Sequence, residues 1–150
     1  MADMTLEQIS EKMRDIDIAV LTTRTAQGSL AGRPMSNNRD VEFDGDSYFF
    51  TLEDTGTVKD VGTDPNVSLS YGAKSGVLNM KPFYITVSGT AELIQDKTAF
   101  EEHWNKDLDR WFEQGVDTPG LVLVKVSAER LHYWDGYDEG EVKLRQHADA

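Results

Sequence analysis

The segment from Phe83 to Leu93 constrains the fold more than any other part of this sequence. Small or apolar residues occupy every second position of the segment: Phe83, Ile85, Val87, Gly89 and Ala91. Hydroxyl-bearing residues occupy the positions between them: Tyr84, Thr86, Ser88 and Thr90. A period of two residues places the two sets on opposite faces of an extended chain. The segment is therefore predicted to be a long strand with one face in a core and the other outside it.

Further strands are predicted before and after this segment, and helices only at the margins. The predicted strands cover 16–23, 30–37, 41–43, 47–51, 66–71, 121–126 and 130–134. The predicted helices cover 5–15 and 58–62, with a further helical region after Asp96. About seven short strands at regular spacing favour a closed antiparallel barrel over a βαβ fold. The sequence has no internal repeat and no linker, so we expect one domain over residues 1–150.

Local signals mark where several elements begin and end. Thr5 and Gln8 have the spacing of a capping box. Asp44-Gly45-Asp46 is typical of the tight turn of a hairpin joining 41–43 to 47–51. Residues from Gly140 onward are polar and are predicted to be a frayed, flexible tail over about 140–150.

Aromatic residues recur in the helical region that Asp96 is predicted to cap. They follow helical spacing: Phe100, Trp104, Leu108, Trp111 and Phe112. A stripe of this kind usually faces a core, so we interpret it as packing surface rather than as part of a cofactor site.

The charge balance excludes several partner classes. The chain has 27 acidic and 15 basic residues and a formal net charge of −12. Such a field repels polyanions and anionic membranes, so neither nucleic acid nor membrane is an expected partner. No apolar run approaches the roughly 20 residues that span a bilayer. The N-terminus lacks the features of a signal peptide, so we expect a soluble, cytoplasmic protein.

Common catalytic and metal-binding motifs are missing. The chain has no cysteine, and it contains no Gly-x-Gly-x-x-Gly, phosphate-binding Gly-Lys-Ser/Thr or His-Glu-x-x-His motif. Its three histidines, His103, His132 and His147, lie far apart in unrelated contexts. No metal site is therefore expected, and no catalytic residue can be named.

A possible anion site lies at Thr57-Val58-Lys59, where a polar loop leads into the predicted short helix. The free N–H groups of a helix start favour an anion, Thr57 adds a hydroxyl, and Lys59 adds a full charge. A plain N-cap followed by a surface lysine would have the same sequence, and this segment alone does not separate the two.

Several segments occur in an order that resembles the pyridoxamine 5'-phosphate oxidase-like superfamily of FMN-binding split barrels. Phe49-Phe50-Thr51, Thr57-Val58-Lys59 and Asp64-Pro65-Asn66 resemble its aromatic-Thr strand end, its Ser/Thr-x-Lys and its Asn/Asp-Pro. Arg33-Pro34-Met35 resembles its flavin-binding strand, and Tyr133-Trp134-Asp135-Gly136 its aromatic-Trp strand. The resemblance covers most of residues 5–137 and is greatest to the general stress protein 26-like subgroup. It implies a mainly β (α+β) fold: a six- to seven-stranded antiparallel split β-barrel with flanking short helices.

The resemblance also implies a cofactor site for FMN, with FAD as an alternative, at the interface of a homodimer. Arg33 and Lys59 would bind the phosphate, with Thr57 as a hydroxyl donor and Val58 between them. Four residues would line the ribityl chain and the isoalloxazine ring: Pro34, Met35, Phe50 and Thr51. Trp134 would approach the flavin, from the other subunit in one arrangement, while plain core or interface packing is an equal alternative for it.

Two departures from the family pattern bear on the reaction. Ser36-Asn37-Asn38 stands where the family often has a second phosphate-binding lysine. The acidic segment 136–141 stands where true pyridoxamine phosphate oxidases have arginines for the substrate phosphate. Oxidation of pyridoxine phosphate is therefore not expected.

The leading hypothesis is a flavin-binding general stress protein of the stress response, either a weak oxidoreductase or a flavin carrier. The alternatives are a non-catalytic flavin carrier or sensor, and a cofactor-free β-barrel interaction module. Deazaflavin or haem in the same cleft is also compatible with the sequence, although the short tail and the lone His132 argue against haem. The substrate and the electron donor are not specified by the sequence.

Overall fold

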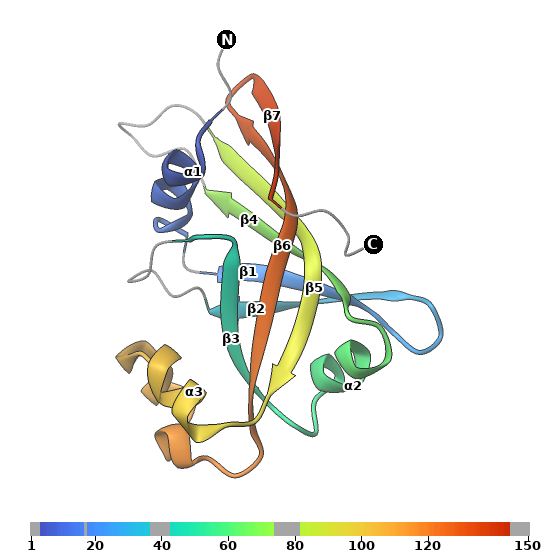
Figure 1. Cartoon of the computed structure of the whole chain (residues 1–150), viewed down its shortest axis with the longest axis vertical. Helices are drawn as coiled ribbons and strands as arrows, with labels where there is room; N and C mark the ends of the chain where they lie inside the picture. Colours follow the sequence, from blue (N-terminus) through green and yellow to red (C-terminus); the bar gives the residue numbers. More distant parts are fainter. Residues whose placement is uncertain (1–3, 17, 37–42, 74–81, 145–150) are drawn as a thin grey trace.

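A seven-stranded antiparallel sheet forms the body of the protein (Figure 1). The computed structural model describes residues 4–16, 18–36, 43–73 and 82–144. The strands are β1 (Ile18–Arg24), β2 (Leu30–Ser36), β3 (Asp46–Leu52), β4 (Asn66–Ala73), β5 (Phe83–Ile94), β6 (Leu121–Asp135) and β7 (Asp138–Lys143). The helices are α1 (Leu6–Met13), α2 (Gly56–Thr63) and α3 (Lys97–His103), with the 3-10 turns η1 (Lys106–Arg110) and η2 (Gly115–Asp117). The predicted mainly β, antiparallel split barrel with short flanking helices is confirmed.

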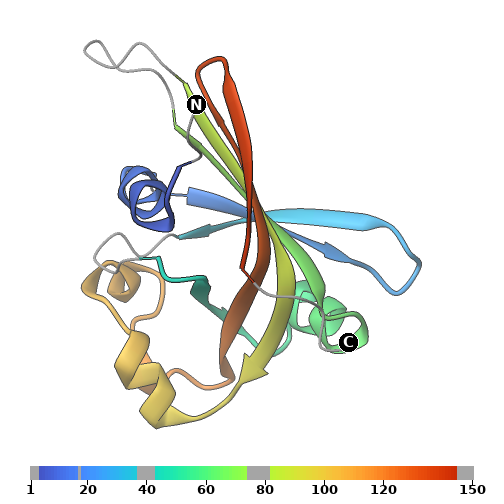
Figure 2. The same cartoon turned by 45° about the horizontal axis from the view of Figure 1, so that its top comes forward.

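The barrel is open between β2 and β3. The strand order is β2-β1-β4-β5-β6-β3, with β7 paired to the second half of β6. In the described parts of the chain, β2 pairs only with β1, and β3 pairs only with β6. The strongly twisted sheet curls toward itself without closing (Figure 2). Two strand edges therefore lie on either side of the opening.

The first helix forms where the capping box predicts it. The Gln8 N–H donates to Thr5 Oγ1 at 3.1 Å, and the Thr5 N–H donates to Gln8 Oε1 at 2.8 Å. Ile9 and Met13 on the inner face of α1 are buried. The Phe43 N–H donates to Ser10 Oγ at 2.7 Å, which joins the segment before β3 to this helix.

The long alternating segment is β5, and its alternation is confirmed. Its small or apolar positions are buried against the core, while the positions between them are exposed or half-buried. The strands predicted at 121–126 and 130–134 are one continuous strand, β6. The register between β5 and β6 shifts between Ser88 and Gly89, because β6 has one additional residue there, Glu129. Because of this bulge, β6 continues without interruption between the two predicted strands, 121–126 and 130–134.

Two other expectations need correction, and a third stays a prediction. The predicted hairpin of 41–43 with 47–51 is the third, because Val41 and Glu42 lie outside the described residues; in the described residues β3 pairs antiparallel with β6. The predicted tail begins later than expected, because Asp138–Lys143 forms β7 on β6, while 145–150 lie outside the described residues. The helical region after Asp96 is divided into α3, η1 and η2. Asn105, the N-cap of η1, separates η1 from α3.

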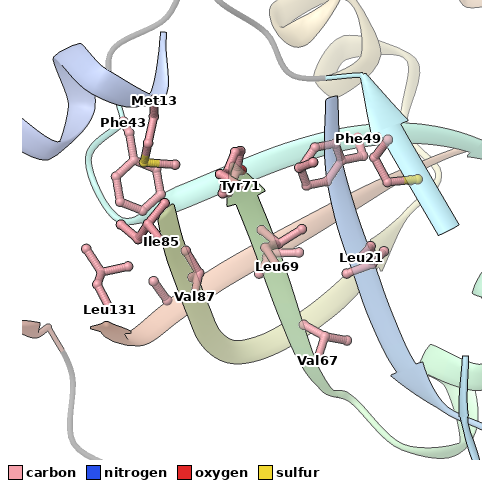
Figure 3. Close-up of a cluster of buried hydrophobic side chains, with 14 of the residues drawn as sticks. Met13, Leu21, Phe43, Phe49, Val67, Leu69, Tyr71, Ile85, Val87 and Leu131 are labelled. Atoms are coloured by element: carbon pink, nitrogen blue, oxygen red, sulfur yellow. The ribbon is translucent and has the colours of Figure 1, made fainter. Parts of the chain in front are cut away.

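The main core fills the concave side of the sheet. Figure 3 shows buried side chains from neighbouring strands meeting there, including Leu21, Leu69, Val87 and Leu131. A smaller cluster of Phe100, Leu121 and Leu123 lies between α3 and the start of β6. No helix in the described segments has the length and apolarity needed to cross a membrane.

Candidate functional site

A cleft of about 510 Å³ lies at the opening between β2 and β3. Its walls come from β2, from the end of β3, from the start of α2 and from the segment after η1. The lining residues are Arg33, Pro34, Met35, Phe50, Thr51, Leu52, Thr55, Gly56, Thr57, Trp111 and Phe112. Among the described residues β2 and β3 each pair on one side only, so backbone groups of both edges can reach a ligand in this cleft.

A second hollow of about 290 Å³ extends the cleft. The two hollows share five residues: Pro34, Met35, Phe50, Trp111 and Phe112. The second one adds Ile18, Ser36 and Leu108, and no charged side chain is among its described lining residues. The cleft therefore has a charged end at Arg33 and an apolar end beside Trp111.

The charged end rests on a network of three residues from three elements. The Arg33 guanidinium donates through Nη1 to Thr23 Oγ1 at 2.6 Å, and its Nη2 lies 3.4 Å from Asp60 Oδ2. Thr23 in turn donates to the same Asp60 oxygen at 2.7 Å. Thr23 is buried, and the Arg33 and Asp60 side chains are only 22% and 12% exposed. The network fixes the guanidinium at the cleft and leaves N–H donors of Arg33 for a ligand.

The start of α2 forms the floor of this charged end. Its N-cap residue, Thr55, makes no side-chain cap bond, and its hydroxyl donates to Leu52 O at 2.8 Å instead. The first-turn N–H groups are therefore not satisfied by the cap and can donate hydrogen bonds to an anion. Thr57, in that turn, is 5% exposed and lines the cleft.

We expect Asp60→Ala to lower the free energy of unfolding by about 1–3 kcal/mol, because it removes a charged acceptor from Thr23 and Arg33 at a poorly solvated position. Asp60→Asn should cost less, because an amide oxygen can still accept from Thr23. Urea unfolding of both variants measures the effect.

The matched control is Asp117→Ala. Asp117 pairs with Lys97 at 2.7 Å, a shorter distance, but both side chains are more than half exposed, at 69% and 60%. Solvent screening leaves such a pair with little effect on stability. Equal losses in the free energy of unfolding for Asp60→Ala and Asp117→Ala would show that the network at Arg33 stabilises the protein no more than an exposed ion pair does.

The structure brings most of the predicted site residues together. Six of them line the cleft: Arg33, Pro34, Met35, Phe50, Thr51 and Thr57. Val58 and Lys59 lie in the same first turn of α2 but are not among the lining residues, and Lys59 is exposed. The role of Lys59 stays a prediction.

Trp134 does not line the cleft of its own chain. It lies in the second half of β6, opposite Tyr84, and stacks on His132 with ring centroids 4.2 Å apart. His132 Nε2 lies 2.5 Å from Glu139 Oε2. A contact between Trp134 and a cleft would therefore need a second copy of the chain.

Sequence reasoning missed four residues of this site. Thr23 and Asp60 support Arg33 from positions 10 and 27 residues away in the chain, and no local pattern joins them. Trp111 and Phe112 were interpreted as core: Phe112 does pack against the cluster around Phe100 and also lines the cleft, whereas Trp111 is exposed and lines the cleft. The missed signal for these two was Asn105, whose side chain accepts from the Asp107 N–H and starts a new helical turn with a new phase.

Both described histidines, His103 and His132, stack on aromatic side chains. His103 stacks on Tyr48 with ring centroids 3.6 Å apart, and burial lowers the pKa of His103 below its ordinary value. Within residues 4–144, apart from the gaps named above, no three His, Asp or Glu side chains are grouped as a metal site would require.

Comparison with known families gives one match along nearly the whole chain. Residues 4–148 match the family described as Pyridoxamine 5'-phosphate oxidase like. Among characterised proteins, the chain is similar to Protein bli-3 of Neurospora crassa, with 24% identity over 140 residues. That alignment covers 87% of this chain and 65% of bli-3, so this chain spans less than two-thirds of the relative's length.

Solved structures show the same fold. General Stress Protein 26 from Bacillus anthracis superposes with a TM-score of 0.74 at 24% identity, over 94% of this chain and all of the other. A heme binding protein from Mycobacterium smegmatis also superposes with a TM-score of 0.74, at 14% identity, over 95% of this chain and 60% of the other. The same fold is thus found in proteins with different names, one of which is named for heme binding.

Proposed function

This chain belongs to the pyridoxamine 5'-phosphate oxidase-like family, and we propose that it binds FMN in the cleft between β2 and β3. The observation that carries the proposal is the division of the cleft into a charged end and an apolar end. A phosphate needs charge-assisted donors, and Arg33, Thr57 and the first-turn N–H groups of α2 supply them. A planar ring needs apolar walls and a few directed hydrogen bonds, which the β2 and β3 edges can supply.

Lys59 and Val58 take part in this proposal less directly. Lys59 is exposed in the first turn of α2, and its long, flexible side chain can extend toward a phosphate held at that turn. Val58 contributes its backbone N–H. FAD remains an alternative ligand, because the open cleft sets no limit on what extends beyond the phosphate.

We further propose that the working form is a homodimer in which Trp134 approaches the flavin of the partner. An apolar band on the outer face of the sheet supports this: Ile18, Val20 and Tyr84 are 49%, 41% and 51% exposed. Trp134 stacks on His132 beside Tyr84 on the same face. A band of this kind on strands β1, β5 and β6 is typical of a protein–protein contact.

Flavin supplies redox chemistry when it is bound, and this chain would supply position and electrostatics. The described cleft residues include no Asp, Glu, His, Lys or Tyr, so no side chain there can hold or move a proton at neutral pH. That observation favours a flavin-binding general stress protein with weak oxidoreductase activity, or a flavin carrier or sensor without turnover. Steady-state assays with NADH or NADPH and an acceptor separate the two.

Two other functions fit the site less well. The hairpin of β6 and β7 carries Asp135, Asp138, Glu139 and Glu141, and this charge would repel a phosphorylated substrate such as pyridoxamine phosphate. Haem proteins usually offer an axial side chain such as histidine, and none lines the described cleft. We therefore propose flavin rather than haem for this chain.

The purified protein is expected to show flavin absorbance, or to quench the fluorescence of added FMN as it binds. Mass spectrometry of the released ligand distinguishes FMN from FAD, deazaflavin and haem. Circular dichroism in the same sample verifies that the protein is folded. Folded protein that is colourless and leaves FMN fluorescence unchanged would contradict the proposal and favour a cofactor-free interaction module.

A further inference from the structure

Trp111 is the most exposed of the aromatic residues that line the cleft. It is 65% exposed, whereas the next residue, Phe112, is half-buried. Phe112 meets Trp104 edge to face at 5.8 Å, and Trp104 meets Phe50 of β3 at 4.9 Å. This chain of rings fastens the segment to β3 and leaves the Trp111 indole over the cleft.

The backbone at Trp111 is also fixed. The N–H groups of Trp111 and Phe112 donate to Leu108 O at 2.9 and 3.0 Å, and Leu108 is buried. The base of the Trp111 side chain therefore has a defined position. The indole is a flat, largely exposed surface on a backbone that is held in place, and the Arg110 guanidinium lies 6.0 Å from its ring centroid. A flat aromatic surface of this kind can stack against a planar ligand.

The position of Trp111 along the cleft indicates what would cover it. The indole lines both hollows, the one that contains Arg33 and the apolar one. Pro34 and Phe50 form further apolar walls of both hollows. A ligand whose anionic group lies at Arg33 and whose planar ring lies in the apolar hollow would pass this indole.

We propose that Trp111 is a ligand-binding residue that stacks against the planar ring of the bound molecule. The inference rests on the proposed flavin site and deepens it by assigning an orientation: phosphate at Arg33 and ring against Trp111. With this orientation, the phosphate and the ring contribute to the binding affinity at different residues, so ligands with and without a phosphate can test the two contributions separately. FMN has both a phosphate and a ring, whereas riboflavin has the ring alone.

The test compares Trp111→Ala and Trp111→Phe with the unchanged protein, using FMN and riboflavin as probes. Trp111→Ala should weaken binding of both flavins by the same factor, about tenfold or more, because loss of a stacked aromatic affects the ring only. Trp111→Phe should restore most of the affinity, since it keeps a flat apolar surface. It should also raise the emission of bound FMN, because an indole quenches a stacked flavin.

Leu30→Ala is the control. Leu30 is an exposed apolar residue at the start of β2, it lines neither hollow, and its removal should leave both affinities unchanged. The proposal is overturned if the unchanged protein binds FMN and Trp111→Ala binds it equally well. It is also overturned if Trp111→Ala alters only the oligomeric state, which would make the indole a protein contact. Failure of the unchanged protein to bind either flavin contradicts the flavin site itself as well.

Discussion

Gly89→Ala is expected to destabilise the protein by about 3 kcal/mol or more, because there is no room for a methyl group at this position. A Cβ built on Gly89 would lie 2.1 Å from the backbone carbonyl oxygen of Ser127. The obstacle is backbone rather than a flexible side chain, so relief requires the bulge between β5 and β6 to move. That bulge lies at the centre of the sheet, where β5 and β6 pair over most of their length. For a domain of about this size, the loss corresponds to a melting temperature lower by roughly 6–12 °C.

Gly62→Ala is the control for this prediction. No atom lies within 4 Å of a Cβ at Gly62, which is in α2. Alanine is a better helix former than glycine by about 1 kcal/mol, so this variant should be as stable as the unchanged protein or more so. Thermal and urea unfolding of both variants give the comparison. A Gly89→Ala protein that melts at the temperature of the unchanged protein would show that the bulge is not as rigid as it looks.

Arg33→Ala is expected to weaken FMN binding by about 100-fold and to leave riboflavin binding nearly unchanged. A hydrogen bond to a charged group contributes about 1.5–3 kcal/mol, and 2.7 kcal/mol is about 100-fold in affinity. Riboflavin has no phosphate, so it does not use this cation. Arg33→Lys should lie between the two, because lysine keeps the charge but lacks the planar fork that reaches Thr23, Asp60 and the ligand together.

Arg24→Ala provides the control for charge alone. Arg24 is an arginine on the adjacent strand, 53% exposed and 3.6 Å from Asp64, and it does not line the cleft. Its removal makes the net charge of the protein more negative by the same amount as Arg33→Ala does, but it should change FMN affinity by less than about threefold, because salt and water screen this charge. Because Arg33→Ala also removes the cation beside Asp60, unfolding of each variant has to be measured first. Equal FMN affinity in Arg33→Ala and Arg24→Ala would exclude Arg33 from the phosphate site.

Elements with a strong local period or a local cap were predictable from the sequence. The capping box at Thr5 and the alternation of β5 both depend on residues a few positions apart, and both are confirmed. The partner of β3 was not predictable in this way. Asp44-Gly45 is a good turn sequence, and Gly45 does adopt a φ of 115°, but a turn does not determine which distant strand edge pairs with the next strand.

The residues of the candidate site also fall into those that local sequence predicts and those that depend on distant segments. Arg33, Phe50 and Thr57 could be assigned because short segments around them resemble a known family. Asp60 could not, because its relation to Arg33 exists only after β1, β2 and α2 have packed together. Trp111 could not either, because the helical period that placed it in a core is interrupted at Asn105. In both cases the missing information is the three-dimensional arrangement of segments that the sequence keeps apart.

The edges of β2 and β3, which have no partner strand among the described residues, would give the proposed ligand a second effect, on the solution behaviour of the protein. Strand edges that face an open cleft can pair with strands of other molecules, and proteins generally keep such edges covered. A ligand seated between these edges would cover them from within the molecule. If flavin occupies the cleft as proposed, its loss would expose both strand edges as well as remove a redox group. We then expect the flavin-free protein to aggregate more readily than the flavin-bound protein.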